Sequence, residues 1–463
     1  MLDLTKLAMQ MQGISEHLAK EAEAAQRRIK IAKTLLQQAT PRQAKLVEQL
    51  YDYRPQLGFT AAEPIEPLGN HIALTPAPEA HTVLATDGSQ INPSHHEIAY
   101  CYLLNVGRVI LHYGQSRYPL LDSLPEVIYR PEDLYASRQW GIRTEEWMGY
   151  RRTVAEAVVL SEMAQELGDR RQEAGDREDV ETRGRGDRRV EVDRGDGGDG
   201  GDRDGMVPPL TPHPSPLTTH PLTHSPTHHH HPLPTIHYSP PSTPTLAMTD
   251  GSLIYWFLDQ LPAAARDCIL EPILTAWELL KQARVPIVGY ISASRSGEAL
   301  NFLRLQSCPF DGPDCATHCE GQMDSAPCQV FSPLRDVTLW SSLLQPGERG
   351  PIFKSSADIL QLYGDHGIYF CYVHVGSEIA RVEFPQWVAE NTSLLDTALG
   401  LTLTQVQKGY GYPVALAESH NQAVVRGGDR NRFFALLEQQ MIKAGLQNVG
   451  TSYKEARKRG SIA

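Results

Sequence analysis

The 463-residue sequence has no run of about 18 apolar residues, and its first residues, MLDLTKLAMQMQ, lack the order of a secretory signal. We therefore expect a cytoplasmic protein that does not enter a membrane. Basic residues are also relatively few: the 43 basic residues are outnumbered by 55 acidic ones, which gives a formal net charge of −12. This balance argues against a protein that coats nucleic acid, but it permits a site that gathers carboxylates around divalent cations.

Cysteine is scarce as well, and seven residues, an odd number without an export signal, argue for thiols or metal ligands rather than a disulfide framework. Three lie in apolar segments and are predicted to be core residues: Cys101, Cys268 and Cys371. Four fall in a Gly- and Pro-rich loop over 307–330: Cys308, Cys315, Cys319 and Cys328. No pair has the two-residue separation of a zinc knuckle, so structural Zn²⁺, reduced thiols and an iron–sulfur cluster all stay open.

The chain divides into an N-terminal helical segment over 1–75 and a larger domain over 76–463. Apolar residues recur at helical spacing near the start, which predicts an amphipathic helix with a stripe that needs a partner surface: Leu4, Leu7, Met11, Ile14 and Leu18. Over 168–245 the sequence turns to Gly, Asp and Arg and then to Pro, Thr, Ser and His. Such composition predicts a disordered insertion that is dispensable for the fold.

The rest of the larger domain alternates strand and helix patterns. HTVLATDGSQ predicts a strand ending in a turn, a hairpin follows through 105–108, and a helix spans 144–167. LAMTDGSL, VPIVGYIS, GIYFCYVHV and ARVEF predict further strands, with a helix over 263–284 after the first of them. This order indicates an α/β fold with a mixed sheet flanked by helices.

Two aspartates occupy matching positions, in VLATDGSQ and LAMTDGSL, each at the predicted end of an apolar strand. One Asp-Gly turn alone is usually structural. Two copies after two strands instead point to Asp87 and Asp250 as a pair of carboxylates at one sheet edge. An aspartyl-phosphate enzyme would need an acid two residues earlier, where Ala85 and Met248 stand.

A metal site would need a third acid, and Glu156 is the best candidate because it shares a helical face with apolar residues. Glu162 on the same helix is the alternative third acid. Glu156 could instead form a surface ion pair with Arg152, four residues earlier, and have no role in a metal site. His420 lies on an apolar helical face in YPVALAESHNQAVV, so spacing alone favours a hydrogen-bonded core histidine.

Several motifs in order resemble the NurA nuclease family, particularly its bacterial members. They are TDGSQINPSHHE, NVGRVILHYG, TDGSL, GYISASRS, DVTLWSSLLQPGERGPIF, IARVEFPQWV and GYPVALAESHNQAV, spread over about residues 80 to 445 apart from the insertion. The resemblance implies an RNase H-like core and a metal-dependent deoxyribonuclease with Mn²⁺ or Mg²⁺, two ions per site. Asp87, Glu156, Asp250 and His420 then look like the catalytic and metal-binding residues.

The resemblance also implies DNA contacts, through Arg295, Arg349 and either Tyr412 or Tyr410. Its partners would be single- and double-stranded DNA ends, a HerA-like hexameric ATPase and a second copy in a homodimer. The implied role is 5′–3′ exonuclease and single-strand endonuclease activity in DNA end resection and double-strand break repair. The alternative is a catalytically weak adaptor or DNA-binding partner of a HerA-like ATPase.

Overall fold

The computed structural model describes residues 4–93, 99–183, 243–319 and 325–446. Its strands are β1 (Glu63–Pro64), β2 (Ile72–Ala73), β3 (His81–Ile91), β4 (Tyr102–Tyr113), β5 (Leu120–Ile128), β6 (Thr245–Asp250), β7 (Ile287–Ile291), β8 (Glu348–Arg349), β9 (Phe353–Lys354), β10 (Ile368–His374) and β11 (Ile379–Pro385). In the described ranges they form one 11-stranded sheet, ordered β1-β9-β10-β11-β7-β6-β3-β4-β5, with β8 pairing to β10 and β2 to β8. The predicted mixed sheet is confirmed.

The α-helices are α1 (Leu4–Ala39), α2 (Gln43–Tyr53), α3 (Pro131–Leu134), α4 (Thr144–Arg183), α5 (Ala263–Gln282), α6 (Glu298–Ser307), α7 (Cys315–His318), α8 (Asp336–Ser341), α9 (Gln386–Ala389), α10 (Thr392–Lys408), α11 (Val414–Ala423) and α12 (Gly427–Lys443). Short 3-10 helices are η1 (Thr40–Arg42), η2 (Arg54–Gln56), η3 (Ala136–Trp140), η4 (Trp256–Gln260), η6 (Asp358–Leu362) and η7 (Gly364–His366). Helix α4 continues beyond the predicted end at Leu167 to Arg183, and 184–242 of the predicted insertion lie outside the described residues.

Five neighbouring strands set the position of the two aspartates. β3 pairs antiparallel with β4, β4 antiparallel with β5, and β3 and β7 both run parallel to β6. Thr86 pairs with Thr249, so the next residues along these two strands, Asp87 and Asp250, reach the same level of the sheet.

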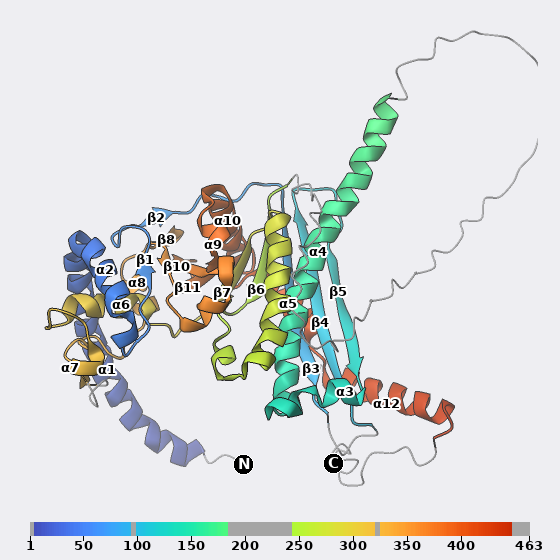
Figure 1. The fold of residues 1–463 in the computed structure, drawn as a ribbon, viewed down its shortest axis with the longest axis horizontal. Coiled ribbons are helices and arrows are strands. Elements are labelled where there is room, and N and C mark those ends of the chain that lie inside the picture. Colours follow the sequence, from blue (N-terminus) through green and yellow to red (C-terminus); the bar gives the residue numbers. More distant parts are fainter. Residues whose placement is uncertain (1–3, 94–98, 184–242, 320–324, 447–463) are drawn as a thin grey trace, which may run out of the picture. The chain divides into compact units, whose positions relative to one another are not determined.

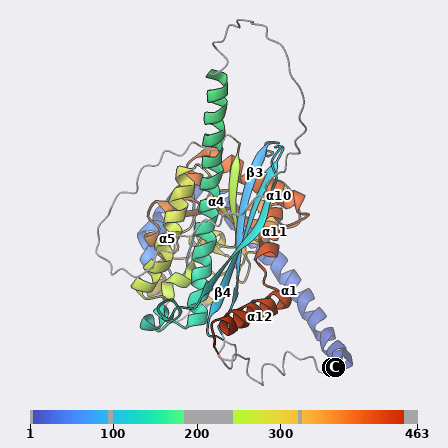
Figure 2. The same ribbon diagram turned by 90° about the vertical axis from the view of Figure 1, so that its right-hand side faces the viewer.

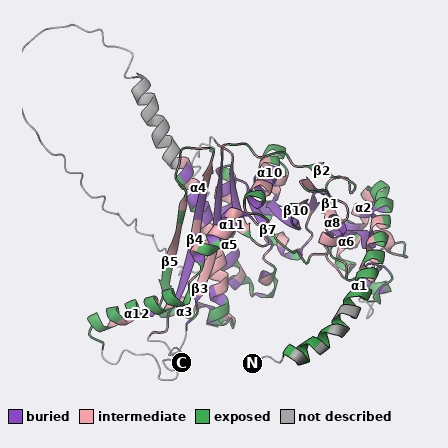
Figure 3. Ribbon diagram, turned by 180° about the vertical axis from the view of Figure 1, so that it is seen from behind, coloured by how far each residue is buried: buried purple, intermediate pink, exposed green. Residues whose placement is uncertain are grey.

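Helices cover both faces of this part of the sheet (Figures 1 and 2). In Figure 2, α4 and α5 lie on one side of β3 and β4, and α10 and α11 lie on the other. Leu84 and Ala247 pack with Leu160 of α4 and Trp277 of α5 on the first side. On the second side the strands pack against Leu399 of α10 and Leu416 of α11. Figure 3 accordingly shows the central strands largely buried.

Helix α1 of the N-terminal segment buries residues of its second half. Ala32 and Leu36 of α1 are buried in a cluster with Phe302 of α6 and Trp340 of α8. The predicted stripe in the first half is exposed: Leu4 by 68%, Leu7 by 38%, Met11 by 55%, Ile14 by 52% and Leu18 by 60%. The two-residue strands β1 and β2, which sequence periodicity did not predict, join this segment to the sheet. Among the described helices, none is long and apolar enough to cross a membrane.

Two predicted turns in the sheet were wrong. β4 runs straight through 105–108, where a hairpin was expected, and pairs with β3 and β5 on its two sides. β3 likewise continues past Asp87 through Gly88 and Ser89 to Ile91. The glycines that suggested turns, Gly88 and Gly107, instead lie in extended strands.

These two glycines let helices approach the sheet closely. Asp87 pairs with Gly107 in register, so both face one side of the sheet, while Gly88 faces the other. A Cβ on Gly107 would collide with the backbone of α11 at Ser419, and a Cβ on Gly88 would collide with the Glu156 carboxylate and the Arg152 side chain. Glycine is therefore needed here for close packing.

We expect Gly107→Ala to lower the free energy of unfolding by about 1 to 3 kcal/mol, because α11 must shift to admit the methyl group. Denaturant unfolding in metal-free buffer measures this change. Gly149→Ala is the matched control, since Gly149 lies within α4 and a Cβ there meets nothing within 4 Å. The control should leave stability unchanged or raise it by up to about 1 kcal/mol. Equal stability of Gly107→Ala and wild type would contradict the packing account.

Candidate active site

The two aspartates reach one edge of the sheet by different local structures. Asp250 is the last residue of β6, and Gly251, with φ of 101°, turns the chain away as its N–H donates to Tyr290 at 2.9 Å. The predicted turn is therefore present after Asp250. Asp87 lies inside β3, and its Oδ1 accepts a hydrogen bond from the Gly88 N–H at 2.8 Å. Both carboxylates remain partly open to solvent.

His420 contacts Asp87 directly. Its Nδ1 lies 2.8 Å from Asp87 Oδ2, and the imidazole is 67% exposed. The core histidine favoured by spacing is thus wrong. Leu416 and Ala423 of the same helix are buried, but His420 projects past the close contact at Gly107 to the sheet edge. A carboxylate can only accept, so Nδ1 carries the proton and Nε2 is left as the second ring nitrogen.

Tyr412 contacts the other aspartate. A hydrogen bond to Asp250 contributes to the raised pKa of the Tyr412 hydroxyl, after the larger effect of burial and together with the negative charge of Asp250. The ring also stacks edge-on against Tyr290, with centroids 5.7 Å apart. Tyr410, the alternative from the sequence, is 99% exposed. The structure therefore brings Tyr412, and not Tyr410, into the site.

Glu156 reaches the aspartates from the opposite face of the sheet. Its carboxylate occupies the space left by Gly88, and its Oε1 lies 3.3 Å from Arg152 Nε, so the surface pair considered from the sequence also forms. Burial raises the pKa of Glu156 to about 7 against the opposing effect of Arg152, and the charges of Asp87 and Asp250 raise it further. These three carboxyl groups therefore share one electrostatic environment.

Glu162, the alternative third acid, lies elsewhere. Burial raises its pKa, and its charged neighbours are Glu166 and Arg108, not the aspartates. Arg108 in turn binds Asp122 through two hydrogen bonds of 2.8 and 2.7 Å. Of the two glutamates, only Glu156 joins Asp87 and Asp250.

Two acids that sequence reasoning missed hold the loops of this edge. Glu383 of β11 accepts hydrogen bonds from Ser252 Oγ and Leu253 N, both at 2.8 Å, directly after the Asp250 turn. Glu378 accepts from Tyr290 at 2.9 Å and from Ser292 at 2.8 Å, beyond the end of β7. An acid within the buried strand ARVEF was the available signal for Glu383; nothing in the sequence singled out Glu378.

Comparison with known proteins identifies the family of this chain. A sequence model of the NurA domain matches residues 81–183 and 238–425, more than half of the chain. The chain belongs to the NurA family. A sequence comparison with curated proteins finds no match.

Two solved NurA structures are similar to the whole of this NurA chain at low identity. The crystal structure of the NurA nuclease from Sulfolobus solfataricus is 10% identical, with 97% of this chain and 99% of that chain covered and a TM-score of 0.45. A crystal structure of NurA bound to dAMP and manganese is 11% identical, with 90% of this chain and 96% of that chain covered and a TM-score of 0.25.

The two arginines expected to contact DNA differ in their exposure to solvent in this NurA chain. Arg349 is buried, and its guanidinium binds both carboxylate oxygens of Glu66, at 2.6 and 2.8 Å. This pairing fastens β8 to the segment before β2, so the predicted DNA contact is replaced by a structural ion pair. Arg295 is exposed in the loop after β7, on the side of the sheet edge where β6 ends.

The cysteine loop gives the zinc hypothesis no support. The thiols of Cys308, Cys315, Cys319 and Cys328 are free, and the last three are buried beside Leu57 and Phe59. Cys328 Sγ accepts a hydrogen bond of 3.4 Å from Arg304. Of the cysteines predicted to be core, Cys101 and Cys371 are buried, but Cys268 is exposed on α5. Three of the loop cysteines are therefore buried, Cys308 is half-buried, and neighbouring thiols raise the pKa of Cys308 and Cys319 after the larger effect of burial.

The side chains of Asp87, Asp250, Glu156 and His420 are of the chemical types that bind divalent cations. Carboxylate oxygens and an imidazole nitrogen are ligands for Mn²⁺, and positive charge would offset both causes that raise the pKa of Glu156, burial first and then the charges of Asp87 and Asp250. In the ranges that the structure describes, no three or more His, Cys, Asp or Glu side chains are close enough together to hold a metal ion. The donors therefore share one edge without forming a closed cage.

Proposed function

We propose that this NurA chain is a deoxyribonuclease that depends on Mn²⁺ or Mg²⁺ and uses Asp87, Glu156, Asp250 and His420. The observation that carries the proposal is the convergence of two side chains on Asp87: His420 lies 2.8 Å from its carboxylate, and the Glu156 carboxylate lies against the next residue, Gly88. Acids and a histidine that converge at one site are typical of active sites. Family membership supplies the reaction class, since one NurA structure is named a nuclease and another holds dAMP and manganese.

Each residue has a distinct part in the proposed reaction. Asp87, Asp250 and Glu156 would hold the cation, and Glu156, whose pKa is raised to about 7, would bind it as the deprotonated carboxylate. A bound divalent cation activates water and neutralises phosphate charge. His420, oriented by Asp87 through Nδ1, presents its other ring nitrogen for proton exchange with the leaving oxygen. Tyr412 positions the Asp250 carboxylate.

An RNase H-like core is part of the proposal. It is supported by the strand order β5-β4-β3-β6-β7, in which three antiparallel strands continue into two parallel ones. Acids on β3, on helix α4 and at the end of β6 then follow in the order strand, helix, strand. A count of two cations per site belongs to the same proposal, and Mn²⁺ titration calorimetry measures it.

The biological setting extends the proposal. We place the activity in DNA end resection and double-strand break repair, with a HerA-like hexameric ATPase as partner and a homodimer as the working form. The exposed apolar stripe of α1 supports a protein contact but does not distinguish these two partners. Size-exclusion chromatography of the chain alone and with the ATPase separates the two associations.

An end-labelled DNA assay tests the proposal. Single- and double-stranded substrates are incubated with Mn²⁺, Mg²⁺ or EDTA, and we expect cleavage with either metal and none in EDTA. Stepwise shortening from the 5′ end and internal cuts in single strands would show the expected exonuclease and endonuclease modes. Absence of cleavage with both metals would contradict a nuclease and favour the alternative, a catalytically weak adaptor of a HerA-like ATPase.

A further inference from the structure

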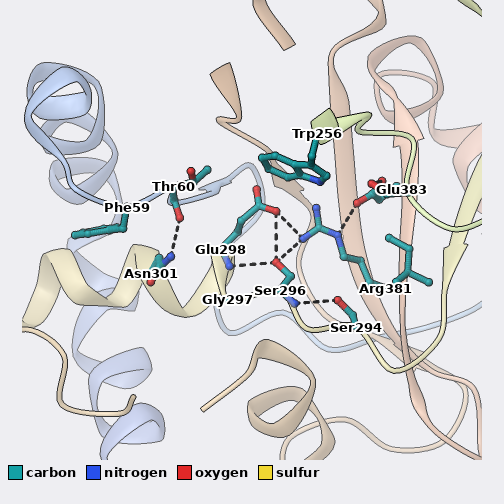
Figure 4. A pocket seen from close by; sticks show the side chains of 12 residues that line it. Phe59, Thr60, Trp256, Ser294, Ser296, Gly297, Glu298, Asn301, Arg381 and Glu383 are labelled. Carbon is teal, nitrogen blue, oxygen red and sulfur yellow. Dashed lines mark hydrogen bonds and ion pairs between the residues drawn. The ribbon is translucent and has the colours of Figure 1, made fainter. Parts of the chain in front are cut away.

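A cavity of about 570 Å³ opens beside the Asp250 turn. Ser252, two residues after Asp250, lines one wall, and Ile291 lines another. Ile291 follows Tyr290, which pairs with Asp250 in the sheet. The loop before α6 and the first turn of that helix complete the lining (Figure 4). The cavity therefore begins two residues after Asp250 and lies on the face of the sheet that Glu156 occupies, because Ile291 faces away from Tyr290 and Asp250.

The charged groups of this cavity are already paired with one another, with one carboxylate in excess. Arg381 is 2% exposed, and its guanidinium lies 2.9 Å from Glu298 and 2.7 Å from Glu383. Glu298 also accepts a hydrogen bond of 2.6 Å from Ser355, while Glu383 holds the loop after Asp250. A phosphate entering here would meet two carboxylates and a guanidinium that is already engaged. The cavity consequently suits an uncharged group.

An aromatic side chain at the same cavity is left open to solvent. Trp256, the first residue of η4, is 44% exposed, although its neighbours Ile254 and Leu258 are buried. The backbone that carries it is further fixed by a hydrogen bond of 2.9 Å from Tyr255 N to the Tyr363 hydroxyl. Figure 4 shows the indole beside the Arg381 network. A rigidly held, exposed indole is a surface on which a flat ring can stack.

We propose that this cavity receives one nucleobase of a DNA single strand, stacked on Trp256, next to the phosphate held at the proposed site of Glu156 and Asp250. The inference rests on the proposed nuclease function and names a position for the base beside the cleaved bond. Every base offers an aromatic face, so stacking here accepts all four bases. Ser294 and Asn301 give the walls neutral polar groups that water or base edges can contact.

Binding of the full-length chain to a fluorescein-labelled single strand in EDTA tests the inference without cleavage. Loss of one stacking contact should weaken binding of Trp256→Ala about five- to 150-fold, and Trp256→Phe should restore most of it. Tyr118→Ala is the matched control, because Tyr118 is 96% exposed and lies outside the cavity lining. Its dissociation constant should equal that of wild type.

Two further measurements separate this inference from the proposed function. A 2-aminopurine base in the strand should lose fluorescence on binding wild type but not Trp256→Ala, which reports stacking directly. If Mn²⁺ supports no cleavage while binding depends on Trp256, the nuclease proposal fails and the base site stands. If wild type cleaves DNA but Trp256→Ala binds within twofold of it, or wild type binds no single strand at all, the base site is overturned.

Discussion

Asp87→Asn and Asp250→Asn should each reduce Mn²⁺-dependent DNA cleavage by about a thousandfold or more, because each removes an anionic ligand from the metal site. The charge stabilisation that a cation gives to a phosphoryl transition state amounts to several kcal/mol, and 1.36 kcal/mol corresponds to a tenfold change in rate. Asp87→Asn also removes the carboxylate that orients His420. Initial rates on an end-labelled single strand measure both effects.

The matched control for these variants is Asp358→Asn, since the Asp358 side chain is 84% exposed and pairs with Arg54 away from the site. It should cleave at the wild-type rate. Folding is checked in metal-free buffer, where neither active-site variant should unfold earlier than wild type, because both remove like charge from beside Glu156. If both active-site variants retain full Mn²⁺-dependent cleavage, the site is assigned to the wrong residues.

Glu156→Gln should abolish most cleavage and yet stabilise the metal-free protein at pH 8. The pKa of Glu156 is raised from 4.5 to about 7, so the fold favours the neutral acid. The corresponding stability is fully present below the unfolded pKa and is lost as the pH rises through about 7. Glutamine stays neutral, so we expect its advantage to grow between pH 5 and pH 8 and to reach on the order of 3 kcal/mol.

Unfolding at a series of pH values in EDTA, and again with Mn²⁺, measures this prediction. Wild type should gain more stability from Mn²⁺ than Glu156→Gln does, because the variant has lost a ligand. Glu162→Gln is the control on the same helix, and it should keep wild-type cleavage and its response to Mn²⁺, since Glu162 neighbours Arg108 and not the aspartates. If Glu162→Gln is inactive and Glu156→Gln is active, Glu162 and not Glu156 is the third acid of the site.

The strands were predicted best from the sequence where the apolar pattern extends over many residues. The strands that carry Asp87 and Asp250 were identified because each has a continuous apolar run before the acid. Their pairing into one edge follows from parallel strands, whose carboxyl ends meet. Two-residue strands such as β1 and β2 have no periodicity to detect, because tertiary pairing alone defines them.

The errors have a common physical origin in tertiary contacts. Gly107 was interpreted as a turn residue, but the close approach of α11 is what requires it. His420 was expected in the core because its helix has an apolar face, yet its ring pairs with the Asp87 carboxylate of β3 and remains 67% exposed. The network of Arg381 with Glu298 and Glu383 joins residues distant in sequence, which no local pattern predicts.

Because Gly88 has no side chain, a substitution there can inactivate the proposed site without replacing any ionisable residue. Gly88→Ala would push the Glu156 carboxylate and Arg152 aside while every acid, histidine and arginine stays in the chain. The isoelectric point and long-range field would be those of the native protein, unlike in any Asp→Asn variant. Such a chain is the better candidate for trapping uncut DNA in crystals, since substrate attraction would be preserved while hydrolysis is stalled by geometry.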